Sequence, residues 1–138
     1  MRIAVVDGQG GGMGKTLVER IRQTLGSQVE ILALGTNALA TAAMLKAGAD
    51  EGATGENAIV VNASRVDYIL GSVGILSANS MLGELTPRMA AAIAESPAQK
   101  ILIPLNRCNL FIVGIRDEPL IKHIEEAAEF MKTMIASK

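Results

Sequence analysis

The chain is poor in aromatic residues and in cysteine. Aromatics make up 2% of its 138 residues, tryptophan is absent and there is one cysteine. The core must therefore be aliphatic, and a disulfide framework within the chain is excluded, which suits a reducing compartment. No apolar run approaches the roughly 18 residues that a membrane helix needs, and the first apolar run ends at Asp7, too early for a secretion signal. We expect a cytoplasmic protein that has no membrane partner.

The chain also lacks an excess of either charge, with 13 Lys and Arg against 14 Asp and Glu. Its basic residues are scattered and form no stripe with interleaved aromatics, so we expect no nucleic-acid partner. Apolar residues reach 49% of this short chain. A monomer of this size would leave much apolar surface exposed, which predicts a homo-oligomer that buries a helix face.

The most informative stretch is at residues 3–16. Four apolar residues, rich in β-branched types, lead into a loop with five glycines in the seven positions 8–14, and a helical pattern follows to Leu25. A strand that ends at a glycine loop and continues as a helix directs backbone N–H groups at one point, where the helix dipole adds partial positive charge. The stretch therefore predicts a site for a phosphate or another anion.

The rest of the chain alternates between apolar runs and helical patterns. Strands are predicted at residues 29–34, 58–61, 68–70, 100–104 and 110–115, and helices at residues 38–46, 87–95 and 120–135. The last two strands are joined by a polar turn at 106–109 and are expected to pair as a hairpin, and residues 50–55 are expected to form a polar turn or mobile loop. The alternation predicts one α/β domain over residues 1–138, a Rossmann-like three-layer α/β/α sandwich with a mostly parallel sheet.

The spacing Gly8-x-x-x-Gly12-x-Gly14 resembles the loop of short-chain dehydrogenases, a branch of the Rossmann dinucleotide-binding proteins. In such loops one glycine allows the tight turn, one lets the pyrophosphate approach the backbone, and one lets helix and strand pack closely. The resemblance implies NAD(P) or another nucleotide as ligand. Two features of that family are missing, because residues 34–37 hold no acidic residue for a ribose and Tyr68 has no lysine four positions on.

A second interpretation uses residues 11–16, Gly-Gly-Met-Gly-Lys-Thr, which are similar to the deviant P-loop of ParA/MinD-type ATPases. The similarity implies that Lys15 contacts phosphates and Thr16 holds Mg²⁺ in a nucleotide hydrolase or a small transferase acting on a phosphorylated substrate. Gln9 stands where the full P-loop pattern has its first glycine. In a third interpretation the glycines only permit a tight turn from strand to helix. A separate alternative for the function is a non-catalytic regulatory or scaffold subunit.

Ligands of open parallel sheets bind beyond the carboxyl ends of the strands. The candidate ligand-binding residues follow predicted strands or begin the first helix: Asp7, Gly8, Gln9, Gly10, Gly11, Gly12, Met13, Gly14, Lys15, Thr36, Asn37 and Asn62. Asp7 either holds a ligand hydroxyl or Mg²⁺ or caps loop N–H groups. Lys15 would neutralise a phosphate, and Thr36 or Asn37 would contact a ribose. Together they predict a phosphate-bearing small molecule as the partner.

No catalytic residue and no metal ligand are predicted. Glu84 is better explained as a surface residue than as a general base, and Cys108 has no base partner in the sequence. His123 is the one histidine, and no cysteine or carboxylate spacing marks it as a metal ligand. The sequence therefore predicts where a ligand binds, and it leaves open whether the protein is an enzyme.

Over its whole length the chain resembles a small uncharacterised bacterial family, a domain of unknown function. The stretches that carry this resemblance lie at residues 7–14, 34–37, 44–50, 52–58 and 78–84. The family implies a Rossmann-like fold and brings no activity with it.

Overall fold

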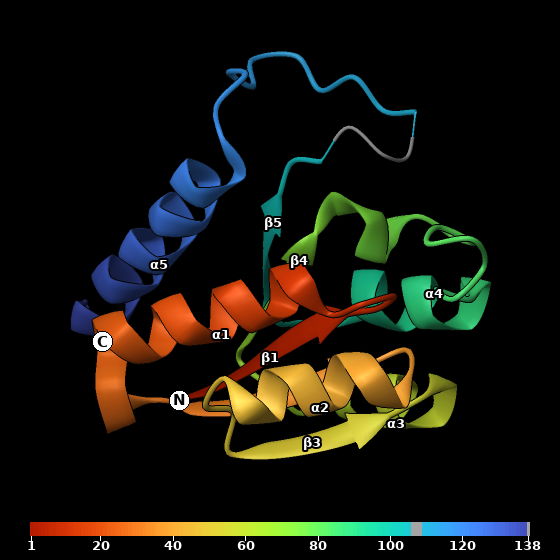
Figure 1. The fold of residues 1–138 in the computed structure, drawn as a ribbon, viewed down its shortest axis with the longest axis horizontal. Coiled ribbons are helices and arrows are strands. Elements are labelled where there is room, and N and C mark those ends of the chain that lie inside the picture. Colours follow the sequence, from red (N-terminus) through yellow and green to blue (C-terminus); the bar gives the residue numbers. More distant parts are fainter. Residues whose placement is uncertain (106–108, 138) are drawn as a thin grey trace.

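A computed structural model describes residues 1–105 and 109–137 of the chain (Figure 1). At its centre lies a five-stranded sheet in the order β3-β2-β1-β4-β5, and all of its strand pairs are parallel. The strands are β1 (Arg2–Asp7), β2 (Glu30–Gly35), β3 (Glu51–Thr54), β4 (Tyr68–Ser72) and β5 (Gln99–Ile103). The predicted α/β class is confirmed, and the sheet is wholly parallel rather than mostly so.

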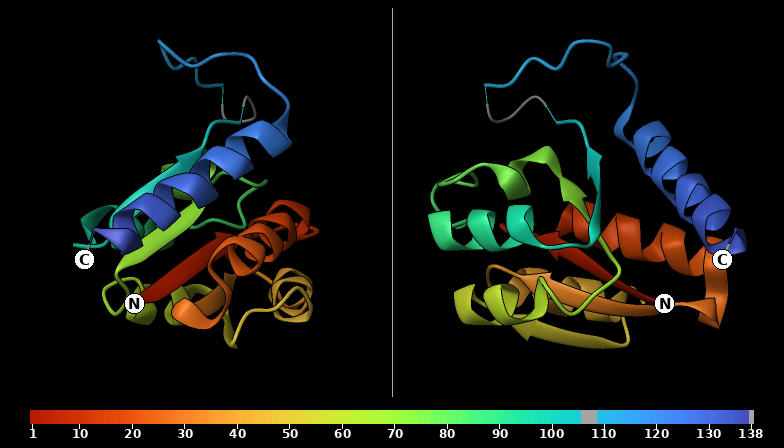
Figure 2. Two further views of the ribbon diagram at one scale, coloured as in Figure 1. Left: turned by 90° about the vertical axis from the view of Figure 1, so that its left-hand side faces the viewer. Right: turned by 180° about the vertical axis from the view of Figure 1, so that it is seen from behind.

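Helices cover both faces of this sheet (Figures 1 and 2). Helices α1 (Gly12–Leu25), α2 (Ala38–Lys46) and α5 (Leu120–Ala136) lie on one face, and α3 (Glu56–Asn62) and α4 (Pro87–Glu95) on the other. In β1, Ile3 and Val5 belong to the core under α1, whereas Ala4 and Val6 belong to the core under α4. Successive strand side chains point to opposite faces, so a strand buried on both faces is apolar throughout, as in other parallel sheets.

Local sequence signals account for several helix ends. The Thr86 hydroxyl accepts a hydrogen bond from the Met89 N–H at 3.2 Å, and Pro87 opens α4, as the sequence predicts. Asn37 Oδ1 accepts from the Ala40 N–H at 2.9 Å and so caps α2. Two short 3₁₀ turns, η1 (Gly26–Gln28) and η2 (Val73–Leu76), follow α1 and β4.

Two predictions for residues 50–62 are wrong. Residues 58–61 belong to helix α3 and not to a strand, and the expected loop at 50–55 contains strand β3. Short apolar runs do not separate a strand from a buried helix, and parallel strands such as β3 and β4 need a crossover between them. The composition of β3 is polar because it is an edge strand, with mostly exposed side chains.

The predicted C-terminal hairpin is also wrong. Strand β5 pairs in parallel with β4, and residues 110–115 form no strand. They belong to the long connection by which the chain returns to α5 (Figure 1). Their apolar side chains are exposed. Of the turn predicted at 106–109, residues 106–108 lie outside the described residues. Within the described part of the chain, no helix is long and apolar enough to cross a membrane.

Candidate functional site

A cavity of about 550 Å³ opens at the carboxyl ends of β1 and β4. Strand β1 lies between β2 and β4, so the chain leaves the two strands β1 and β4 toward opposite faces of the sheet. Open α/β sheets bind their ligands at this switch point. The residues that line the cavity are Asp7, Gly8, Gln9, Gly10, Gly11, Gly12, Met13, Ser72, Gly74, Ser80, Met81, Leu82, Leu105 and Leu120.

Three glycines of the loop are required by the fold itself. A Cβ on Gly8 would clash with the Thr36 hydroxyl, and a Cβ on Gly14 would stand 2.8 Å from the Asp7 Cβ and 2.7 Å from the Met44 sulfur. Gly11 has a φ of 76°, in the left-handed region that favours glycine. These three positions make the turn and let helix α1 pack closely against the end of β1.

Gly10 and Gly12 are different. Nothing lies within 4 Å of a Cβ built on either residue, and both have φ values outside the left-handed region. Both residues line the cavity. Neither the turn nor the packing of the described residues therefore requires glycine at these two positions, and each presents bare backbone to the cavity.

The first turn of α1 presents backbone donors to the same space. Gly12 and Met13 are the first two residues of the helix, and amides at these positions have no partner within a helix. Among the described residues their N–H groups have no acceptor, whereas the Gly14 N–H donates to Asp7 Oδ2 at 2.7 Å. The cavity thus meets two free amides at the positive end of the helix dipole.

Asp7 acts as a cap on this turn. Its side chain is buried, with 7% of the residue exposed. Burial raises the pKa of the Asp7 carboxyl above its ordinary value, against the opposing effect of hydrogen bonds from the N–H groups of Gly14 and Gly8. The negative charge of Glu84 raises this pKa further. Of the two roles predicted for Asp7, these contacts match capping of the loop N–H groups.

Glu84 connects the glycine loop to the end of β2. Its Oε1 accepts hydrogen bonds from the Gln9 N–H at 2.9 Å, the Thr36 hydroxyl at 2.8 Å and the Asn37 side-chain amide at 2.7 Å. These hydrogen bonds lower the pKa of the Glu84 carboxyl. Sequence reasoning missed this role because Glu84 lies 75 residues from Gln9 and 48 from Thr36, and no local pattern relates them.

Several predicted site residues lie outside the cavity lining. Thr36 and Asn37 are held by Glu84, and Asn37 also donates to the Gln9 carbonyl at 3.0 Å. Lys15 is exposed on α1 and is not a lining residue. The placement of Asn62 at a strand end is wrong, because it ends helix α3 and donates to the Ala58 carbonyl at 2.8 Å.

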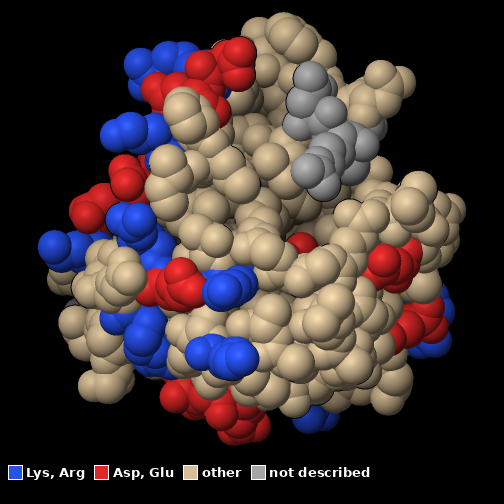
Figure 3. Space-filling view, in the orientation of Figure 1, with Lys and Arg blue, Asp and Glu red and all other residues tan. Residues whose placement is uncertain are grey.

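The lining offers hydrogen bonds rather than acid–base chemistry. Asp7 is the one charged side chain among the described residues that line the cavity. Ser72 is buried and accepts from the Gly74 N–H, and the Ser80 hydroxyl donates to the Gly74 carbonyl at 2.6 Å. In the space-filling view Lys and Arg gather on the side of α1 and α5, and the surface around the central hollow is largely uncharged (Figure 3). Such a site is equipped to bind and orient a ligand through its backbone.

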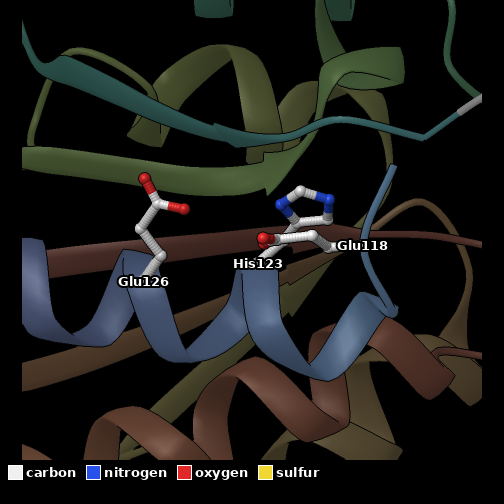
Figure 4. A group of neighbouring side chains, drawn as sticks. All are labelled: Glu118, His123 and Glu126. Atoms are coloured by element: carbon white, nitrogen blue, oxygen red, sulfur yellow. The ribbon is translucent and has the colours of Figure 1, made fainter. Parts of the chain in front are cut away.

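A second group of polar side chains lies away from this cavity, at the start of α5. Glu118, His123 and Glu126 each offer a ligand atom, and these atoms lie within 4.8 Å of one another (Figure 4). His123 was not predicted to be a metal ligand from the sequence. Carboxylates nevertheless stand five residues before it and three residues after it. The three-residue spacing puts Glu126 on the same helix face.

The strand order and the switch-point cavity define a Rossmann-like α/β protein with a glycine loop at the carboxyl edge of its sheet. The chain belongs to the family described as Domain of unknown function (DUF3842), whose model matches residues 2–136. This confirms the family resemblance predicted from the sequence. No curated protein matches the chain.

Among solved structures, the chain is similar to a dodecameric FMN-dependent Ubix-like decarboxylase from Escherichia coli O157:H7. The identity is 15% and the TM-score 0.46, over 99% of this chain and 76% of the other. A likeness of this size transfers neither a ligand nor an assembly to the present chain.

Proposed function

We propose that the protein binds a phosphate-bearing small molecule of nucleotide type, NAD(P) or another nucleotide, in the cavity beside the glycine loop. The observation that carries this proposal is the pair Gly10 and Gly12, which line the cavity without a steric or conformational need for glycine. A glycine costs roughly 0.5–1 kcal/mol relative to alanine within ordered structure. Close approach of a ligand to the backbone explains why these two positions nevertheless hold glycine.

The three roles of glycine in a dinucleotide loop fall on three separate residues here. Gly8 permits the tight approach to Thr36, Gly14 permits the packing of α1 on β1, and Gly12 is the position open to a ligand. The amides of Gly12 and Met13 would donate to phosphate oxygens at the helix N-terminus. These backbone amides would therefore make the phosphate contact that is predicted for Lys15 from the sequence.

The cavity volume is suited to such a ligand. Small-molecule sites span about 300–1,000 Å³, and the cavity measures about 550 Å³. Leu82, Leu105 and Leu120 provide apolar surface for a ring system, and Ser80 is a polar residue of the same lining. We assign Thr36 and Asn37 to shaping the loop, because their side chains are already bonded to Glu84.

A thermal-shift screen tests this proposal. NAD⁺, NADP⁺, FMN, FAD and ATP are each added at about 1 mM, and anything carried through purification is identified by mass spectrometry. A ligand at 100 times its Kd stabilises the folded state by about 2.7 kcal/mol, so at least one nucleotide should raise the midpoint. If none does and no small molecule co-purifies, the proposal fails and a scaffold role is favoured.

The P-loop hydrolase alternative has no contact in its favour. Lys15 lies outside the lining, and the Thr16 hydroxyl donates to the Gly12 carbonyl at 3.0 Å, within its own helix. A hydrolase would release phosphate from ATP, and Lys15→Ala would abolish that release. We expect no such activity from the wild-type protein.

A further inference from the structure

A cluster of metal-ligand type lies at the N-terminal end of α5. His123 and Glu126 come from the helix, and Glu118 comes from the segment that leads into it. Figure 4 shows the three side chains on the same side of α5. Their ligand atoms, one imidazole nitrogen and two carboxylate oxygens, lie within 4.8 Å of one another.

The spacing is close to what one ion requires. Zn²⁺ binds histidine nitrogen and carboxylate oxygen at about 2.0–2.2 Å, so two ligand atoms of one tetrahedral ion stand about 3.4 Å apart. Glu126 is exposed and Glu118 and His123 are half-buried. Since none of the three side chains is buried, their rotation would bring the ligand atoms to the spacing of one ion.

The charges and partners of the cluster also suit a divalent cation. Two carboxylates and a neutral imidazole balance a charge of +2. In the described residues, the side chains of His123 and Glu126 form no hydrogen bond or ion pair. Glu118 has one ion-pair partner, Arg116 at 3.8 Å, whose side chain is 87% exposed, and an exposed pair of this kind is weak.

The three residues also face a cavity. They line a space of about 390 Å³ between β5 and α5, separate from the one at the glycine loop. Lys100 lines the same space, and its ammonium group donates to the Ser96 carbonyl. Three protein ligands beside an open space leave a fourth position for water or another small ligand, the arrangement of zinc sites that are not purely structural.

We propose that Glu118, His123 and Glu126 form a binding site for a divalent transition-metal cation, with Zn²⁺ as the preferred ion. The imidazole selects Zn²⁺ over Mg²⁺ and Ca²⁺, which favour oxygen ligands alone. The site is independent of the nucleotide proposed for the glycine loop. Binding would tie Glu118, at the end of the exposed connection from β5, to the first turns of α5.

Calorimetric titration of the chelator-treated protein with ZnCl₂ tests the site. We expect one Zn²⁺ per chain. His123→Ala and Glu126→Gln should each weaken binding by about tenfold or more, since loss of a residue that only hydrogen-bonds to a metal ligand already costs about that much. Glu129→Gln is the matched control, because Glu129 is exposed on the same helix and outside the cluster. It should bind Zn²⁺ as the wild type does.

If His123→Ala folds poorly, Glu126→Gln still tests the site, because Glu126 is exposed and its substitution should not disturb the fold. Urea denaturation of each apo-protein establishes that the variants are folded. The proposal is overturned if the wild type takes up no Zn²⁺, if Glu126→Gln binds it unchanged, or if Glu129→Gln loses as much affinity as Glu126→Gln.

Discussion

Gly12 and Gly14 stand two residues apart in the first turn of α1, yet only Gly14 is required by the fold. A Cβ on Gly14 meets the Asp7 Cβ at 2.8 Å, whereas a Cβ on Gly12 meets nothing within 4 Å. Gly14→Ala should therefore destabilise the protein by about 1–3 kcal/mol, the scale of overpacking in a close-packed site. Gly12→Ala should leave the free energy of unfolding unchanged or raise it by up to about 1 kcal/mol. Urea denaturation of the two variants makes the comparison, and equal losses would contradict it.

Asp7 makes stability depend on pH in a defined direction. Burial raises its folded-state pKa, so the folded protein holds the proton more tightly than the unfolded chain. The stability due to this group is complete below the unfolded pKa and falls as pH rises through the folded pKa. Asp7→Asn removes the titration and retains a side-chain oxygen as an acceptor for the Gly14 N–H. The wild type should thus lose stability relative to Asp7→Asn across that window in urea titrations, and a constant difference would contradict this assignment.

Glu84 should show the opposite dependence. Its folded-state pKa is lowered by the hydrogen bonds from Gln9, Thr36 and Asn37, so the stability it contributes is present above the unfolded pKa. That stability is lost as pH falls through the folded pKa. Glu84→Ala removes a shared acceptor and should cost about 1 kcal/mol at neutral pH, and Glu84→Gln should cost less. Unfolding midpoints of the two variants, measured at neutral and acidic pH, check both the size and the sign.

At the scale of elements, the sequence predicts those whose signals are local. The capped helix α4, the amphipathic helix α5 and the strand–glycine loop–helix unit of β1 and α1 all lie where periodicity and capping residues indicate. Helix α3 was missed because its run Ile59-Val60-Val61 is β-branched, and only Ile59 is fully buried. What makes it a helix is the crossover between parallel strands, which no window of seven residues contains.

The residues of the candidate site also fall into two groups, those with a local sequence signal and those brought together only by the fold. The glycine loop can be recognised in the sequence because its residues are consecutive, and seven of the predicted residues, Asp7 to Met13, line the cavity. The contributions of Ser72, Ser80 and Glu84 depend on loops brought together by the sheet order. His123 could have been found by asking which carboxylates lie near it on a helix, since Glu126 is three residues on.

At the scale of the whole molecule, a long apolar segment is exposed. Phe111 is 90% exposed and Val113 is 86% exposed, and Leu82 is 97% exposed at the rim of the glycine-loop cavity. Large apolar side chains exposed to this degree are typical of interaction sites. They support the homo-oligomer expected from the composition, which stays a prediction. Light scattering after size exclusion should give a mass above that of one chain, and Phe111→Ser with Val113→Ser should lower it. A clean monomer at micromolar concentration would contradict the prediction.

We propose that position 12 holds glycine because a ligand approaches its backbone. The most direct test is the thermal shift produced by about 1 mM nucleotide in the wild type, in Gly12→Ala and in Gln23→Ala, which alters an exposed position on the same helix. We expect Gly12→Ala to fold as stably as the wild type and to lose most of the thermal shift, whereas Gln23→Ala should keep it. If Gly12→Ala keeps the full shift, Gly12 is not the position that a ligand approaches.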